Sequence, residues 1–296
     1  MARRPGWQLD RLIAITTVPR TVRLDTIGRV PIDVRDRVAC LEASVRIRAS
    51  LDPVDIVTWF TGSVYAYVHG EASHLFDVEG YNIGRSGRVD GGFDVLCREM
   101  MLYLDPVTGV VLDEFRNPFT GAVSEVRHRW NDPVGIRLRT VPPTPELVVV
   151  GDHLHLRADE FVAEPNPLEP RRWPVESSGI EYRHAECSRL IAAVADVMAG
   201  TASAPAQLVA VRIGPWLPWM GMGEAPGRLV YHVGGCKLDG YRSLPGELRR
   251  RVEDGHPEFM FAPATRTGPD ETEWTAYAAH RRPQRTPMTG DAARHP

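Results

Sequence analysis

The stretch VLCREMMLYLDPVTGVVLDEFRNPFTGAVSEVRHRWNDPV, residues 95–134, contains two copies of one turn. The copies are Asp105-Pro-x-Thr-Gly109 and Asn117-Pro-x-Thr-Gly121, and they start twelve residues apart. In each copy proline sets φ at the first corner, Asp or Asn bonds to the turn backbone, and glycine takes the positive-φ position. The stretch therefore predicts three antiparallel strands joined by tight turns into a meander.

Strand patterns continue on both sides of this meander. Residues 57–85 are rich in β-branched and aromatic side chains and break at His69-Gly70, as a hairpin does. Residues 146–162 predict a second pair of strands, bent at Gly151, and further strands are predicted at 208–214, 227–235 and 272–279. Many short strands with few helices favour a mainly β fold, an antiparallel β-barrel or sandwich rich in meanders.

A few short peripheral helices complete the predicted fold. An apolar stripe predicts a helix within residues 31–53, and a further helix begins at Pro245. Residues 185–200 also have helical spacing, ending at Gly200. The stripe of the first helix is Val34, Val38, Leu41 and Val45, and that of residues 185–200 is Cys187, Leu190, Ile191, Val194, Val197 and Met198.

The expected domain organisation is simple. Residues 1–33 form an N-terminal extension, residues 34–280 a single mainly β domain, and residues 281–296 a disordered tail rich in proline and arginine. The 296 residues are enough for one substantial core.

Composition excludes several classes of partner. A net charge of -3 carries no electrostatic signature of nucleic-acid or membrane binding. Cys40, Cys97, Cys187 and Cys236 are scattered without a CxxC, which favours a reducing cytoplasm over a disulfide framework. The only lysine, Lys237, follows no phosphate-binding motif, so we expect no cofactor. No apolar run has the length of a signal peptide core or a membrane span.

Six phrases of the sequence together resemble the domain of unknown function 1838 family of bacteria and fungi. They are GYNIGR, REMMLYLDPVTG, NPFTG, WNDPV, GPWLPWMGMGEAPGRLVYHVGGCKLDG and ETEWTAY, and the resemblance runs from about Val34 to Tyr277. It implies an uncharacterised family, with no activity and no catalytic residues to transfer. Some members carry twin-arginine leaders, but Arg3-Arg4 here precede no apolar segment, so we expect this chain to stay in the cytoplasm.

The segment 212–235 is the most unusual part of the chain. Pro215 and Pro218 exclude a helix interior and a ladder strand, so Trp216 and Trp219 stand on stiff backbone. The indoles suit the wall of an apolar pocket, with Met220 and Met222 as adaptable contacts, or else they plug one end of a barrel. Exposed tryptophans here would equally suit a homodimer interface.

The meander contains polar groups suited to acid–base chemistry. Alternation places Glu99 in a row with Met101 and Tyr103, and a carboxyl group buried in apolar surroundings has a raised pKa. His128 shares a face with Trp130 on the third predicted strand and could reach the Glu99 row inside a barrel. The alternative is a structural glutamate paired with an arginine.

Other polar groups allow two interpretations each. Tyr81, Asn82 and Asn131 either cap turns or hydrogen-bond a ligand. His184 and Glu186 stand where the helix of residues 185–200 should begin, so Glu186 either favours the helix dipole or acts as a pocket acid. His153 and His155, with His184, would form a metal site, although the simplest pattern leaves the first two in water.

These observations predict a cofactor-independent enzyme that acts by acid–base chemistry, as an isomerase, cyclase or lyase, on a hydrophobic small molecule in a barrel-like pocket. A lipid or terpenoid carrier is the alternative, and a metal-dependent oxygenase or hydrolase is a weaker one. The candidate catalytic residues are Glu99, His128, Tyr103, Glu186 and His184. The candidate ligand contacts are Trp216, Trp219, Met220, Met222, Trp130, Tyr81, Asn82 and Asn131.

Overall fold

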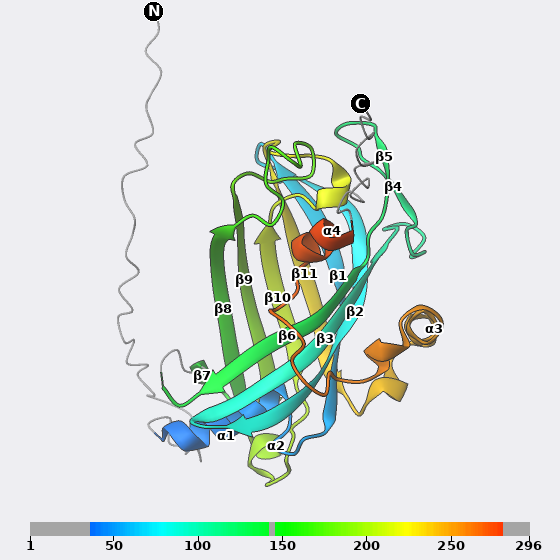
Figure 1. Ribbon diagram of the computed structural model, residues 1–296. Helices are drawn as coiled ribbons and strands as arrows, with labels where there is room; N and C mark the ends of the chain where they lie inside the picture. Colours follow the sequence, from blue (N-terminus) through cyan, green and yellow to red (C-terminus); the bar gives the residue numbers. More distant parts are fainter. Residues whose placement is uncertain (1–35, 142–145, 281–296) are drawn as a thin grey trace, which may run out of the picture. The chain divides into compact units, whose positions relative to one another are not determined.

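The computed structural model describes residues 36–141 and 146–280, so the predicted extension over 1–33 and tail over 281–296 lie outside the described residues. The main strands are β1 (Asp55–Val68), β2 (Glu71–Val89), β3 (Gly92–Leu104), β6 (Arg129–Arg139), β7 (Glu146–Val150), β8 (His153–Pro165), β9 (Glu181–Ala193), β10 (Gln207–Gly214) and β11 (Arg228–Leu238). They form one antiparallel sheet in the order β6-β3-β2-β1-β11-β10-β9-β8-β7. The sheet curls into a half-barrel (Figure 1), which confirms the mainly β, barrel-like prediction.

Short elements surround this sheet. The helices are α1 (Arg37–Arg48), α2 (Val194–Met198), α3 (Gly246–Gly255) and α4 (Glu273–His280). In the described part of the chain, the 3-10 turns are η1 (Pro218–Met220), η2 (Tyr241–Ser243) and η3 (Pro257–Met260). A separate two-stranded sheet consists of β4 (Glu114–Arg116) and β5 (Val123–Glu125).

The twin turns form as predicted, but the three-stranded meander does not. Asp105 Oδ1 accepts the backbone N–H of Thr108 at 2.8 Å, and Gly109 and Gly121 have φ of 69° and 72°. The middle segment, however, pairs as β4 with β5, while β3 pairs directly with β6. Asn117 Nδ2 donates to the carbonyl of Met220 and ties the second turn to η1. The segment between β3 and β6 therefore leaves the main sheet and forms the separate two-stranded sheet.

The hairpins predicted at His69-Gly70 and Gly151 are both confirmed. His69 adopts a positive φ of 51° and Gly70 one of 91°, which lets the chain reverse between β1 and β2. The strands predicted at 208–214 and 227–235 are β10 and β11, and the helix predicted after Pro245 is α3.

The helix predicted over residues 185–200 is wrong. Most of this segment is β9, paired along its length with β8 and β10, and only α2 is helical. Along β9, inward Tyr182 and Leu190 are buried while outward Arg183 and Arg189 are exposed. Pairing with β8 and β10 supplies the backbone hydrogen bonds of β9. This pairing outweighs the helical spacing of the apolar residues, such as Leu190 and Ile191, which arises by coincidence.

The strand predicted at 272–279 is also wrong, because this segment is α4. Thr272 begins the helix, with its Oγ1 accepting the N–H of Thr275 at 3.2 Å. Trp274 and Tyr277, three residues apart, are buried on the same side. Their spacing suits a helix better than a strand.

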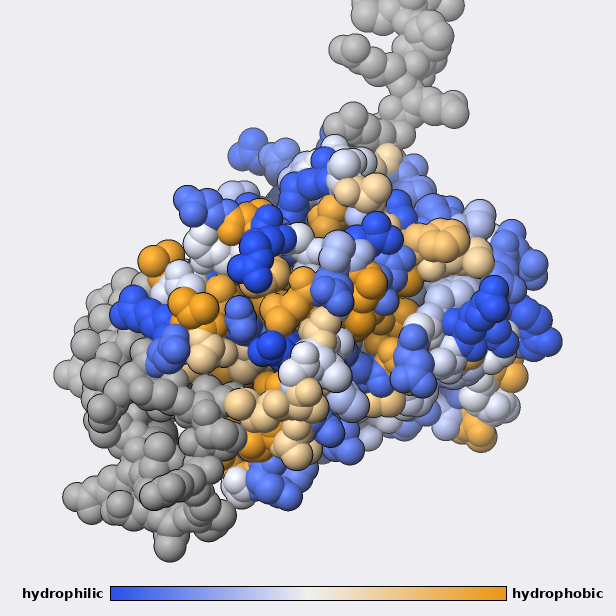
Figure 2. Space-filling view, turned by 90° about the horizontal axis from the view of Figure 1, so that it is seen from below, coloured by the Kyte–Doolittle hydropathy of each residue, from blue (hydrophilic) through white to orange (hydrophobic). Residues whose placement is uncertain are grey.

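The helix predicted within 31–53 is confirmed as α1. Asp36 caps its start by accepting the N–H groups of Val38 and Ala39. Leu41 and Val45 are buried as predicted, but Val38 is 59% exposed, and Val34 lies outside the described residues. α1 and α2 lie at one end of the sheet, and Figure 2 shows apolar side chains gathered on that face among charged ones.

The two faces of the sheet carry separate cores. Tyr81, Met100 and Leu102 project from the convex face and pack against α3 and η3. Phe76, Tyr103 and the tryptophans of residues 216–219 pack on the concave face, together with Trp274 of α4. α4 thus fills one end of the half-barrel. Within the described ranges, no helix combines the length and apolarity required to cross a membrane.

Candidate active site

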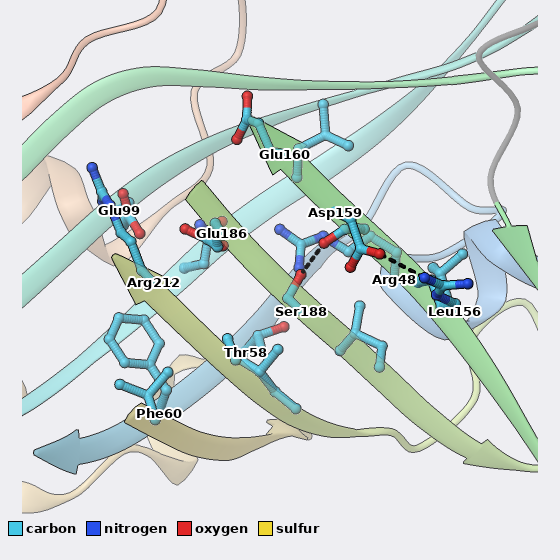
Figure 3. Close-up of a pocket in the computed structure, with 18 of the residues that line it drawn as sticks. Arg48, Thr58, Phe60, Glu99, Leu156, Asp159, Glu160, Glu186, Ser188 and Arg212 are labelled. Atoms are coloured by element: carbon cyan, nitrogen blue, oxygen red, sulfur yellow. Dashed lines mark hydrogen bonds and ion pairs between the residues drawn. The ribbon is translucent and has the colours of Figure 1, made fainter. Parts of the chain in front are cut away.

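A cavity of about 660 Å³ lies on the concave side of the sheet (Figure 3). This volume is typical of pockets that enclose a small molecule. Its apolar walls are Phe60, Met101, Ile136, Leu138, Leu156, Leu190, Leu208 and Val233. Its polar lining includes Thr58, Asn82, Glu99, Arg129, Glu160, Glu186, Arg212 and Tyr231. The cavity is therefore amphipathic.

One row of polar side chains crosses four adjacent strands. Thr58 of β1 pairs with Asn82 of β2, Asn82 with Glu99 of β3, and Glu99 with Asn131 of β6. Directly opposed residues in antiparallel strands project from the same face, so these side chains meet on the concave side. The strand register thus brings together three predicted site residues, Asn82, Glu99 and Asn131.

A second row crosses the strands on the other side of the cavity. Glu160 of β8 pairs with Glu186 of β9, Glu186 with Arg212 of β10, and Arg212 with Tyr231 of β11. All four residues line the cavity. Figure 3 shows Glu186 and Arg212 toward the same end of the cavity as Glu99. Of this row, the sequence pattern indicated only Glu186 as a site residue.

A buried ion-pair network lies behind Glu99. Arg129 donates to Glu99 Oε1 at 3.1 Å and to Glu273 Oε2 at 2.8 Å, while Tyr103 donates its hydroxyl proton to Glu273 Oε1. Asn131 Nδ2 donates to Glu99 Oε2 at 3.3 Å. Glu99 is thus the arginine-paired carboxylate that the sequence analysis held as its alternative, although it still lines the cavity.

The network keeps its members in defined protonation states. Burial raises the pKa of Glu273, but the charges of Arg129 and Arg212 and the Tyr103 hydrogen bond outweigh burial and lower it below the ordinary value. Burial and the negative charge of Glu273 raise the pKa of Tyr103 well above the ordinary value. Tyr103 therefore donates a structural hydrogen bond and does not line the cavity.

Arg129 has two carboxylate partners, whereas Arg212 has none among the described residues. Its Nη2 donates to the hydroxyl of Tyr182 at 2.6 Å, and no carboxylate of the described residues lies within 4.0 Å of its guanidinium nitrogens. Glu186, directly opposite in register, has no hydrogen-bond or ion-pair partner in the described part of the chain. Burial and the charge of Glu273 raise the pKa of Tyr231, so its hydroxyl stays protonated. Glu186 and Arg212 are available to a ligand, and Tyr231 faces the same cavity with Tyr103 as a hydrogen-bond partner.

His184 faces inward from β9, beside Glu186, rather than standing at the start of a helix. Its Nε2 lies 3.8 Å from Glu160 Oε2, and its Nδ1 is buried without a hydrogen-bond partner. The interaction with His184 lowers the pKa of Glu160, so that carboxylate is ionised near neutral pH. Although β9 was predicted as a helix, His184 and Glu186, two of the predicted catalytic residues, both lie on its concave face.

His128 does not reach the Glu99 row. Its Nδ1 accepts the backbone N–H of Tyr103 at 3.2 Å, in the position where the strand ladder would otherwise continue. Burial and the charge of Arg251 lower the pKa of His128 to about 4, so the ring is neutral. The histidine completes the end of the β3–β6 pairing and does not line the cavity.

Tyr81 and Trp130 lie on the convex face, away from the cavity. The hydroxyl of Tyr81 donates to the carbonyl of Phe259 at 2.7 Å, and the ring of Trp130 stacks on His256 at 3.9 Å. Adjacent residues of a strand project from opposite faces, so neither can join its neighbour Asn82 or Asn131. Their predicted placement at a ligand pocket is not observed.

The tryptophan segment is a core plug rather than a cavity wall. Trp216, Trp219 and Met220 are buried, and Met222 packs against the same cluster. Trp219 contacts Phe76 and Phe115, and Trp216 Nε1 donates to the carbonyl of Ala225 at 3.0 Å. None of the four predicted contacts lines the cavity. Both indoles are buried, so they do not form the exposed surface that would have suited a homodimer interface.

The three histidines of the predicted metal alternative do not meet. On β8 and β9, His155 pairs with Ile191 and His184 with Val162, so the two sites are about 23 Å apart along the strands. His153 Nδ1 instead contacts Asp152 at 2.6 Å. Across 36–141 and 146–280, no group of three or more His, Cys, Asp or Glu side chains is arranged to hold a metal ion.

Several site residues were missed by the sequence analysis. Arg212 and Tyr231 lie in strands that were correctly predicted, and alternation with the inward residues Ala210 and Val233 was a signal for both. Glu273 carried no such signal, because its segment was assigned to a strand.

The fold and the site define an open antiparallel β-barrel with a charged, ligand-sized cavity on its concave face. The chain belongs to the family described as protein of unknown function (DUF1838), whose model matches residues 54–281. This span contains both polar rows and the Arg129 network. A search of curated proteins finds no match.

Proposed function

We propose that the cavity binds an amphipathic small molecule and that the protein catalyses proton transfer at a carbon next to a carbonyl group, as an isomerase, cyclase or lyase. Such acid–base chemistry uses side chains alone. We place the reaction in the cytoplasm, in keeping with the scattered cysteines.

One observation carries this proposal. Glu186 and Arg212 are direct cross-strand neighbours on the cavity wall, and among the described residues neither has an opposite charge within 4.0 Å. A base must be free to take a proton, and a cation that stabilises developing charge must have donors to spare.

In the reaction, Glu186 removes a proton from the carbon next to the carbonyl. The electron pair of the broken C–H bond forms a C=C bond, and negative charge moves to the carbonyl oxygen, where Arg212 stabilises it. Glu186 becomes neutral as the substrate oxygen becomes negative, so the net charge inside the cavity does not change. In a substrate conjugated with a C=C bond, return of the proton from Glu186 to the far carbon re-forms the C=O bond and completes an isomerisation. In a substrate with a leaving group on the β-carbon, the C=O bond re-forms, the leaving group departs with the electrons of its bond to carbon, and it takes the proton from Glu186, which completes an elimination.

Tyr231 and the Arg129 network support this chemistry. The Tyr231 hydroxyl, opposite Arg212 in register, remains protonated and is a second donor for the oxygen. Arg129 also lines the cavity, but its guanidinium group is already ion-paired with Glu99 and Glu273. We therefore assign Glu99 a positioning role, and Glu186 the proton transfer.

Deuterium exchange tests this function without knowledge of the product. The protein is incubated in D₂O with amphipathic ketones, enones and keto acids, and mass spectrometry follows deuterium at carbon. We expect the wild type to accelerate exchange in at least one compound and Glu186→Gln to lose the acceleration by about a hundredfold or more. The matched control is Glu146→Gln, because Glu146 also lines the cavity but is paired with Arg157.

A carrier is the second candidate, favoured by the long apolar walls of Leu156, Leu190 and Leu208. A carrier would bind the same compounds without exchange, and Glu186→Gln would bind them as tightly as the wild type. Acceleration that survives in Glu186→Gln would overturn the assignment of the base.

A further inference from the structure

The two ends of the cavity differ in charge. At the end near α4, the lining carboxylates of Glu99, Glu160 and Glu186, with Glu273 behind them against Arg129, outnumber the guanidinium groups of Arg129 and Arg212. At the end near α1, Arg48 projects from the last turn of the helix into the lining. Figure 3 shows Arg48 beside Leu156, with Glu99 and Arg212 at the opposite end.

The carboxylates near Arg48 are already engaged. Glu146 and Asp159 both contact Arg157, at 2.8 Å and 2.7 Å. No carboxylate of the described residues lies within 4.0 Å of the Arg48 guanidinium, which is partly buried. Arg48 therefore presents an uncompensated positive charge to the cavity.

A second cation strengthens the positive end. The ammonium of Lys237 donates to the carbonyls of Arg46 and Ala49 and to Ser203 Oγ, none of which is negatively charged. Burial and the positive charge of Arg48 lower the pKa of Lys237 to about 7. An anion bound at Arg48 would relieve the repulsion between the two groups.

From this geometry we infer that the ligand is an amphipathic carboxylate whose headgroup binds Arg48 and whose chain extends to the Glu186–Arg212 end. The two ends lie roughly 13 Å apart, the length of four residues from Leu156 to Glu160 on β8. Leu156, Leu190 and Leu208 line the path between them. The inference rests on the proposed function, because it names the substrate class of the same cavity.

Guanidinium groups bind carboxylates through paired, charge-assisted hydrogen bonds, so the headgroup should contribute measurably to affinity. The opposite orientation would bring the carboxylate to Arg212 but also toward Glu160 and Glu186, which repel it, whereas the carboxylates near Arg48 are already paired with Arg157. The favoured orientation leaves the far end of the chain free to present a carbonyl group to Glu186.

Two probes of equal chain length, dodecanoate and dodecanol, test the inference by calorimetric titration of the full chain. We expect the wild type to bind dodecanoate at least about tenfold more tightly, and Arg48→Met to lose that preference while binding dodecanol as before. Arg37→Met, with the same substitution in the same helix but outside the cavity lining, should keep the preference. Thermal melting verifies that each variant folds.

Arg212→Met decides the orientation. We expect it to keep the preference for dodecanoate. Loss of the preference in Arg212→Met but not in Arg48→Met would place the headgroup at the other end and overturn the inference. Equal binding of both probes to the wild type would also overturn it, while leaving the cavity as a ligand site. Binding of neither probe would contradict the proposed function itself.

Discussion

Arg129 on β6 and Glu273 on α4 form an ion pair of 2.8 Å between residues 144 positions apart, with less than a tenth of either side chain exposed. The pair attaches α4 to the concave face of the sheet. Arg129 binds Glu273 through Nη2, and through Nη1 it also holds Glu99 at the cavity wall. The helix at one end of the barrel and the wall of the site are thus one connected structure.

We expect Glu273→Gln to destabilise the protein by about 3 kcal/mol, because it leaves a buried arginine with one carboxylate in place of two. Tyr103→Phe removes a single hydrogen bond to the same carboxylate and should cost about 1 kcal/mol. Urea unfolding measures both. Equal effects of the two substitutions would mean that the ion pair contributes little.

Stability should fall in acid through His128. Its folded pKa of about 4 lies below its ordinary value of 6.5, so the neutral ring stabilises the fold above pH 6.5. That contribution, of about 3 kcal/mol, is lost as the pH falls from 6.5 through 4. Urea unfolding at pH 7 and pH 4 measures it.

His128→Gln is the corresponding variant. It should be less stable than the wild type at pH 7 and should lose less stability between pH 7 and pH 4. A variant with the full acid loss would assign the pH dependence to other groups.

Lys237 is expected to hold α1 on the sheet. Its three hydrogen bonds join the last turn of α1 to Ser203, so Lys237→Met should cost about 2 kcal/mol. Hydrogen exchange in α1 should accelerate more than exchange in α3. Uniform acceleration across the chain would show that the effect is not local to α1.

Much of the concave site follows from the sequence wherever strand alternation was recognised. Asn82, Glu99 and Asn131 were selected from neighbouring strands, and the register between those strands aligned them. Alternation also predicts that Tyr81 and Trp130 face away from this row. They were predicted at the pocket because of their neighbours and motifs in the sequence, and not because of alternation. The sequence therefore indicated polar residues on neighbouring strands, but which face of the sheet each one occupies follows from the strand pairing.

Long-range packing determined the rest. Residues 185–200 satisfy a helical period locally, and only pairing with β8 and β10 makes Glu186 an inward residue of a strand. Glu273 reaches the site because α4 packs on the sheet, which no local pattern shows. The prolines around Trp216 and Trp219 predicted a stiff loop, but the loop covers its own aromatic core instead of a ligand.

The core and the cavity should respond separately to mutation. Trp219→Ala removes a buried indole and should cost about 4 kcal/mol, with little change in dodecanol affinity. Ala210→Leu adds bulk to the cavity wall between the strands that bear Glu186 and Tyr231, and should weaken binding while leaving a folded protein. Calorimetry and thermal melting separate the two effects. Loss of dodecanol binding in a folded Trp219→Ala variant would place the ligand at the plug.

The arrangement of Glu186 and Arg212 around a substrate can be observed directly. The crystal structure of the Glu186→Gln variant with methyl decyl ketone should show the ketone oxygen within hydrogen-bond distance of the Arg212 guanidinium. A carbon next to the carbonyl should face the side chain at position 186. A ketone whose oxygen lies away from Arg212, or a chain bound outside the cavity, would contradict the proposed chemistry.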